Sequence, residues 1–213
     1  MQFVSTESLW VLSWGTLGFK VPDDDPMYEA LKARYGVSCR QYHNWVHIEE
    51  CFNAYQNSGI RFWGRQEALL CLAIFYHDAI YDTKSKNNEH NSALLCAADM
   101  RARFVEKEAQ DRVRELIMAT VHSGTPQTFS ECLIADIDLS MLGMPWIDHL
   151  ENSRSIRLEY SQYSDAEFAA GRAKFMSTFL ERPVLYHTPY FQRLCDVQAR
   201  SNLSREIAML TNT

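Results

Sequence analysis

The chain has 213 residues and a mass of 24.7 kDa, with 46% hydrophobic residues, 23% charged residues and a formal net charge of −6 at pH 7. This composition is typical of a globular protein of one domain and excludes a disordered chain, a collagen-like repeat and a coiled coil. The acidic balance and the lack of a long basic run argue against a partner that is a nucleic-acid polymer.

Nothing in the sequence predicts a membrane-bound or secreted protein. The longest apolar run, Ala68 to Tyr76, has nine residues, whereas a membrane-spanning helix needs about 20. The N-terminal segment lacks the basic start and the small-residue cleavage site of a signal peptide. Six cysteines are spread singly, which is typical of reduced core residues. We therefore expect a cytoplasmic protein without a membrane partner.

Helical periodicity dominates the chain. Apolar residues recur at helical spacing within 45–55, 69–80 and 113–121. Helix starts are indicated by Asn87 or Asn88 before Glu89, Pro145, the pair Ser164 and Glu167, and Thr188 with Pro189. Breaks are predicted at 21–26, 57–59, 83–87, 123–127, 142–145 and 182–188. These signals predict an all-α fold, a single helical bundle over 1–213 with roughly nine or ten helices. Its polar motifs lie within 42–140, and helices over 145–211 complete the bundle.

Four polar groupings interrupt the apolar helices. The first is Tyr-His-Asn-Trp-Val-His at 42–47, whose histidines are four residues apart and so are expected to share a helix face. The second is His77-Asp78, followed four residues later by Asp82. The third is His122, and the fourth is Asp136-Ile137-Asp138. Three further histidines, His90, His149 and His187, fit no grouping.

These groupings predict a metal site. Buried charges cost several kcal/mol unless they are paired or bind a metal. Asp78 and Asp82, expected on one helix face, repel each other unless a cation compensates. Imidazole with carboxylate, and no thiolate, suits one divalent ion with open positions for water and substrate, such as Mn, Fe, Co, Ni or Mg, rather than a closed structural zinc site.

The order His…His-Asp…Asp on successive predicted helices resembles the HD superfamily of metal-dependent phosphohydrolases, which is an all-α fold. The segments YHNWVH, FYHDAIYD, NNEHNSA, IADIDLSMLG, AGRAKFMSTFLERP and YHTPYFQRL are similar to the bacterial proteins known only as predicted metal-dependent HD phosphohydrolases. The similarity covers the chain from about Tyr35 onward, and it is specific as a set of motifs.

Two better-understood branches of that superfamily imply residue roles. YHNWVH is similar to the YHNxxH motif of cyclic nucleotide phosphodiesterases, and Asp138-Leu139-Ser140 is similar to their ADLS motif. This resemblance implies His43 as the proton donor to the leaving group. It implies one divalent ion (Mn, Fe, Co, Ni, Mg or Zn) held by His47, His77, Asp78 and Asp138.

The segment HDAIYDT is similar to the HDxxEDT motif of (p)ppGpp hydrolases. This resemblance places Asp82 where an acidic residue assists the attacking water. The chain departs from that motif at Tyr81, which stands where the motif has Glu, so the hydrolytic role falls to Asp82 alone.

Other residues complete the predicted site as supporting or substrate-binding groups: Asn44, Glu89, His122, Asp136, Arg172 and Arg200. Asp136 is an alternative to Asp138 as the fourth ligand, and His122 and Glu89 are candidates to contact substrate or a second ion. Further candidates to bind phosphate are Arg40, Lys84, Lys86 and Arg182.

The predicted function is hydrolysis of a phosphate ester or anhydride of a small molecule such as a nucleotide. Two alternatives remain open. One is an HD-type di-iron oxygenase, which needs two further histidine ligands, and only His90 and His122 lie in the required interval. The other is a domain that senses a nucleotide without cleaving it. The sequence leaves the substrate, the native metal and the oligomeric state open, and a homo-oligomer is among the options.

Overall fold

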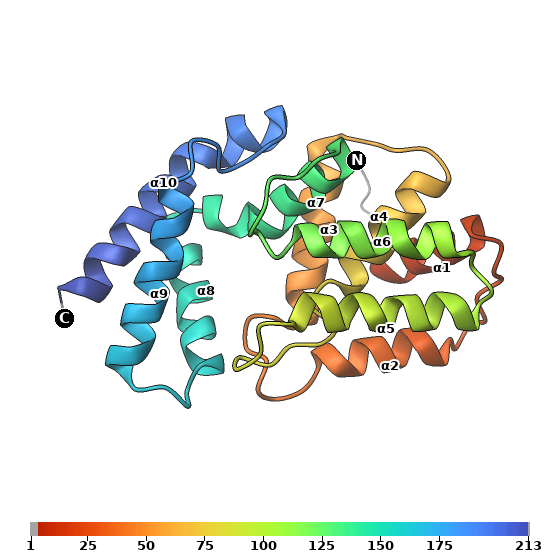
Figure 1. Ribbon diagram of the computed structural model, residues 1–213, viewed down its shortest axis with the longest axis horizontal. Coiled ribbons are helices and arrows are strands. Elements are labelled where there is room, and N and C mark those ends of the chain that lie inside the picture. Colours follow the sequence, from red (N-terminus) through yellow and green to blue (C-terminus); the bar gives the residue numbers. More distant parts are fainter. Residues whose placement is uncertain (1–3, 213) are drawn as a thin grey trace.

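The computed structural model describes residues 4–212, and in this part of the chain it contains α-helices and one 3₁₀ helix but no strand (Figure 1). The all-α fold and the expected number of helices are confirmed. The elements are α1 (Thr6–Thr16), α2 (Pro26–Tyr35), α3 (Trp45–Ser58), α4 (Arg65–Tyr76), α5 (Asn88–Ala102), α6 (Lys107–Ala119), α7 (Phe129–Asp138), η1 (Leu139–Gly143), α8 (Trp146–Glu159), α9 (Asp165–Leu180) and α10 (Pro189–Thr211). No helix in the described range is both long and apolar enough to cross a bilayer.

Local capping explains several helix starts. The Ser164 hydroxyl accepts from the Glu167 backbone N–H, and the Glu167 carboxylate accepts from the Ser164 backbone N–H, so the predicted capping box is confirmed. Thr188 is the N-cap of α10, with Pro189 in its first turn. Pro145 itself takes the N-cap position of α8, one residue before the predicted first turn.

Helix α4 is the centre of the core because it is apolar on all sides. Every residue from Ala68 to Tyr76 is buried. Around it pack α1, α3, α5, α6 and α7. Trp10 of α1 contacts Phe75 edge-on and stacks on Tyr76. Burial of its last nine residues holds the C-terminal end of α4, where the His-Asp motif begins, in a fixed place.

The last three helices form an arm beside this core, seen on the left of Figure 1 and joined to α7 through η1. Helix α10 packs closely on η1 at Gly143, where an added Cβ would lie 2.5 Å from the Cβ of Cys195. This approach therefore requires glycine. Whether arm and core make one folding domain, as predicted, remains a prediction.

Two helix boundaries differ from the predictions. Helix α4 ends at Tyr76, so Asp78 and Asp82 lie in the following turn and loop and do not share a helix face. Helix α3 begins at Trp45, so His43 precedes the helix that carries His47. At both boundaries, the polar residues next to the helix have hydrogen-bond partners outside it.

The cysteines are free thiols in the described structure, but they are not all core residues. Cys51, Cys71, Cys96 and Cys195 are buried, and Cys132 is half-buried, whereas Cys39 is exposed. The expectation of a core position was wrong for Cys39, which lies in the loop between α2 and α3.

Candidate metal centre

Four side chains from three separate segments bring their ligand atoms together. The Nε2 atom of His47, on α3, lies 3.2 Å from Nε2 of His77 and 3.2 Å from Oδ1 of Asp138, at the end of α7. The Nε2 atom of His77 lies 3.4 Å from the same Asp138 oxygen. Oδ2 of Asp78 lies 3.3 Å from His77 Nε2 and 3.8 Å from His47 Nε2.

These spacings fit a shared ion. Two donors bound at about 2.1 Å lie about 3.0 Å apart when the angle at the ion is 90° and about 3.4 Å apart when it is tetrahedral. The imidazoles of His47 and His77 are buried, and the Asp138 side chain keeps 18% exposure. His47, His77 and Asp138, together with Cys51, can therefore hold a metal ion. Asp78 adds a carboxylate oxygen 3.3 Å from His77 Nε2.

Neighbouring groups orient the ligand atoms. Nδ1–H of His77 donates to the carbonyl of Ile74 at 2.9 Å, which directs Nε2 into the cluster. Nε2 of His122 lies 2.8 Å from Oδ2 of Asp138, which leaves Oδ1 facing His47 and His77. His122 has a left-handed backbone with φ 55°, a conformation that is unfavourable for a residue with a side chain. The fold holds His122 there through its carbonyl, which accepts from Arg182.

Charge in the cluster attracts a cation. Burial lowers the pKa of His77, but the adjacent carboxylates of Asp78 and Asp138 raise that pKa well above its ordinary value. Burial opposes ionisation of Asp78, yet His77 lowers the pKa of that carboxyl to about 2. Against burial, hydrogen bonds from His122, His47 and His77 hold the pKa of Asp138 well below its ordinary range. Both carboxylates are thus anions that favour positive charge between the imidazoles.

Cys51 lies within the same group, and the sequence predictions missed it. Its Sγ is 3.7 Å from Nε2 of His47, one helical turn before it on α3. Burial, together with the Asp138 and Asp78 carboxylates, raises the pKa of the Cys51 thiol well above its ordinary value. A thiol that binds a metal ion loses its proton on binding, so Cys51 is a candidate ligand beside His47, His77 and Asp138. The spacing of four from His47 was the available signal.

His43 is held beside the centre by a residue far away in the chain. Its Nδ1 lies 2.7 Å from Oε2 of Glu159, at the end of α8, and the backbone N–H groups of Tyr42 and His43 donate to Oε1 of Glu159 at 2.8 Å each. The His43 ring stacks on Tyr81 at 3.9 Å and lies 6.1 Å from the His47 ring. Burial opposes ionisation of Glu159, but the hydrogen bonds from His43 and this backbone lower the pKa of Glu159.

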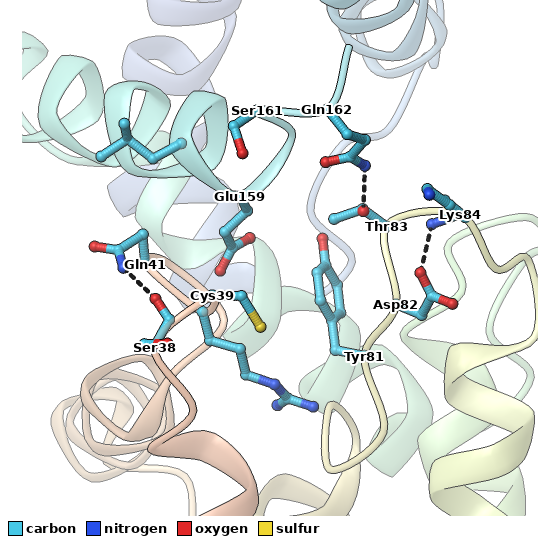
Figure 2. Close-up of a pocket in the computed structure, with 12 residues that line it drawn as sticks. Ser38, Cys39, Gln41, Tyr81, Asp82, Thr83, Lys84, Glu159, Ser161 and Gln162 are labelled. Carbon is cyan, nitrogen blue, oxygen red and sulfur yellow. Dashed lines mark hydrogen bonds between the residues drawn. The ribbon is translucent and has the colours of Figure 1, made fainter.

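A groove of about 660 Å³ adjoins this pair, between the arm and the core (Figure 2). Glu159 and Tyr81 project into it, whereas the metal-binding group does not line it. Figure 2 also shows Asp82 at its outer side, where the carboxylate accepts from the backbone N–H of Lys84.

The predicted role of Asp82 in assisting the attacking water stays a prediction. Asp82 is exposed, in the loop after α4, and its carboxylate accepts from the backbone N–H of Lys84 in the same loop. Glu89, in the first turn of α5, is half-buried and is a second candidate for this role. Burial raises the pKa of Glu89, and the charges of Asp78 and Asp138 raise it further, whereas His122 lowers it.

Several other predicted site residues have structural partners instead. Asn44 caps α3 by accepting from the Val46 N–H. Asp136 accepts from the backbone N–H groups of His187 and Thr188 and from the Thr188 hydroxyl, each at 2.7 Å, and so holds the start of α10. Between the alternatives Asp136 and Asp138, only Asp138 reaches the cluster within the described chain.

The candidate phosphate-binding arginines and lysines also differ in their partners and in their exposure. Arg200 donates to the carbonyls of Leu180 and Arg182, and Arg40 donates to those of Asp78 and Ala79. Lys84 and Lys86 are exposed in the loop after α4. Arg172 is different, since its side chain is nine-tenths buried and its Nε donates to Glu206 at 3.0 Å.

Comparison with known proteins adds no relative. No family model matches the chain, no curated protein matches it, and no solved structure matches it. An all-helical structure with a His/Cys/His/Asp group at metal-binding distance is compatible with a metal-dependent HD-type site. That likeness therefore depends on the motifs and on the geometry described above.

Proposed function

We propose that this chain is a metal-dependent hydrolase of the HD type that cleaves a phosphate ester or anhydride of a small, nucleotide-like molecule. One observation supports the proposal above all: the ligand atoms of His47, His77, Asp78 and Asp138 converge at spacings of 3.2 to 3.8 Å. Two nitrogens and two oxygens leave coordination positions open, which suits catalysis better than a closed structural site.

The chain's own residues divide the remaining work. A divalent ion bound at this centre supplies Lewis acidity toward a phosphoryl oxygen and lowers the pKa of an attacking water. Nδ1 of His43 contacts Glu159, which leaves Nε2 as the nitrogen that gives a proton to the leaving oxygen. Glu89, with its raised pKa, orients and deprotonates the water. His122 keeps Asp138 in a fixed orientation.

The two alternatives have less support. A di-iron oxygenase needs two further histidine ligands, and in the described structure His122 hydrogen-bonds to the cluster, whereas His90 is exposed on α5. A sensor that binds a nucleotide without cleaving it does not require a proton-donating histidine. His43 is nevertheless held beside the metal-binding group by the buried carboxylate of Glu159.

The test combines metal analysis with turnover. The 213-residue chain is purified, its metal content is measured by mass spectrometry, and release of phosphate from a panel of nucleotides and phosphate esters is followed. We expect about one ion per chain, turnover that chelator abolishes and added metal restores, and loss of both metal and turnover in His47→Ala and Asp138→Ala. The exposed histidine variant His90→Ala is the control and should keep both.

Two results would overturn the proposal. Metal-loaded protein without turnover on the whole panel would favour a sensor. Two irons per chain with oxygen consumption would favour the oxygenase.

A further inference from the structure

Tyr81 contacts the proposed acid, His43, through its aromatic face. The two rings stack with their centroids 3.9 Å apart and their planes at 22°. Tyr81 is half-buried and stands where the HDxxEDT motif has Glu. Burial raises the pKa of the Tyr81 phenol well above its ordinary value, so the phenol stays neutral. A neutral phenol does not take a proton from water, so Tyr81 has a different task from a carboxylate at this position.

The stacking on Tyr81 fixes what the contact with Glu159 leaves free. Glu159 holds one atom of the His43 ring, Nδ1, at 2.7 Å. A ring held through one atom can still rotate about that contact, and its far nitrogen, Nε2, then moves away from the reacting atoms. Stacking on Tyr81 fixes the plane of the ring as well. Glu159 and Tyr81 together therefore determine where Nε2 of His43 lies.

Arg40 supports Tyr81 from the core and connects it to the metal-binding group. The Cζ atom of Arg40, a residue with 8% exposure, lies 5.7 Å from the centroid of the Tyr81 ring and 5.1 Å from that of Tyr35. Nη1 of Arg40 donates to the carbonyl of His43 at 3.3 Å and to that of Asp78 at 2.7 Å. One buried guanidinium thus links the segment of the acid, the aromatic support and a predicted metal ligand.

The other end of Tyr81 reaches the arm. Figure 2 shows the Tyr81 hydroxyl pointing toward the arm, and this oxygen lies 3.4 Å from the hydroxyl of Tyr160. Tyr160 directly follows Glu159 at the end of α8. Two consecutive residues of the arm therefore contact the two rings of the stack, one ring each. The acid is held in place from both the arm and the core.

We propose that Tyr81 is a positioning residue that keeps Nε2 of His43 on the leaving oxygen, and that this fixed acid makes the site selective for phosphate esters of alcohols over phosphate anhydrides. This inference rests on the proposed function and narrows its substrate class to esters such as those of a nucleotide's sugar hydroxyl.

The selectivity follows from the basicity of the leaving oxygen. Water forms the new bond to phosphorus and gives up a proton to a base. The bond from phosphorus to the leaving oxygen breaks with its electrons on that oxygen, and Nε2 of His43 supplies the proton that makes it an alcohol. An alkoxide is far more basic than the phosphate released from an anhydride, so proton donation accelerates ester cleavage more.

The experiment compares two phosphate esters that differ only in the leaving group, benzyl alcohol or p-nitrophenol, with the metal-loaded 213-residue chain. p-Nitrophenoxide is a weak base and departs with little help from an acid. At equal metal content, Tyr81→Leu should lower kcat at least about tenfold on the benzyl ester and stay within about twofold on the p-nitrophenyl ester. Tyr81→Phe keeps the aromatic face and should stay within about twofold of the parent on both. Tyr190→Leu, at a half-buried tyrosine of α10, is the matched control and should change neither.

A second measurement requires neither metal nor turnover. An aromatic ring shields protons that lie over its face, so the ring protons of His43 should resonate upfield in the NMR spectrum of the chelated chain. His43→Gln identifies these signals by their loss. They should stay upfield in Tyr81→Phe and move downfield in Tyr81→Leu. If Tyr81→Leu does not fold, the position of the His43 signals in the parent still tests the stacking.

Equal losses of Tyr81→Leu on both esters, no loss on the benzyl ester, or His43 signals without an upfield shift in the parent would overturn the inference. A parent that shows the shifted His43 signals but cleaves neither ester would contradict the hydrolase proposal, and the positioning of His43 by Tyr81 would stand. The two failures are therefore distinguishable.

Discussion

Glu159 and His43, 116 residues apart in the chain, are joined by a 2.7 Å contact between Oε2 and Nδ1. The carboxylate side chain is 1% exposed, whereas the imidazole keeps 19%. Glu159 is thus fixed in the arm, and His43 lies beside the metal-binding group with its second ring nitrogen, Nε2, available. The core and the arm must both be in place before His43 can act as an acid.

Glu159→Gln should lower turnover about 10²-fold, because the His43 ring loses the carboxylate that holds it beside the metal-binding group. Steady-state kinetics at equal metal content measure the effect. Glu151→Gln, on an exposed position of the same helix, is the control. Turnover in Glu159→Gln equal to that of the parent would show that Glu159 does not position His43 for the reaction.

Glu89→Gln and Asp82→Asn separate the two candidate bases. The charges of Asp78 and Asp138 act on Glu89, whereas the Asp82 carboxylate contacts its own loop. Glu89→Gln should therefore reduce kcat about 10²-fold. Asp82→Asn should stay within about twofold of the parent, as expected for an exposed side chain away from the reacting atoms. Equal metal content in both variants is the necessary control. A larger loss in Asp82→Asn would restore the motif-based assignment.

The stability of the arm should depend on acid through Glu206. Its pKa is lowered to about 2, below the ordinary value of about 4.3, so its contribution is complete above the ordinary value and is lost as pH falls toward 2. That contribution is about 3 kcal/mol in the free energy of unfolding. Urea unfolding at pH 5, 4 and 3 should therefore show a shallower loss in Glu206→Gln than in the parent. Parallel losses would mean that Glu206 is not an anion in the folded protein.

Phe104 is a site for stabilisation away from the metal centre. It has a left-handed backbone with φ 57° and is 96% exposed. Phe104→Asn should raise the free energy of unfolding by about 0.5 to 1 kcal/mol, because asparagine adopts this conformation more readily. The control Leu94→Asn, which is exposed on helix α5, should lower it instead. Thermal unfolding monitored by circular dichroism distinguishes the two directions.

Much of the local structure could be predicted from neighbouring residues. The capping box of Ser164 and Glu167 and the start of α10 at Thr188 and Pro189 depend on contacts within one helical turn. Polar interruptions of the predicted helices singled out four groupings, and the resemblance to HD phosphohydrolases implied His47, His77, Asp78 and Asp138 as the ligands, which the structure brings together. The prediction that His43 shares a helix face with His47 was wrong because α3 begins after His43, and the same prediction for Asp78 and Asp82 was wrong because α4 ends before both.

The sequence by itself therefore determined the helical class and the residue types suited to a metal centre, since propensity, capping and periodicity act over a few residues. Only the tertiary structure decided that Asp136 holds α10 while Asp138 reaches the cluster, and that Glu159 holds His43. Each of those choices depends on which segments meet in space. Distant pairings are set by packing of the core helices around α4 and by contacts between the arm and the core, and no local pattern encodes them.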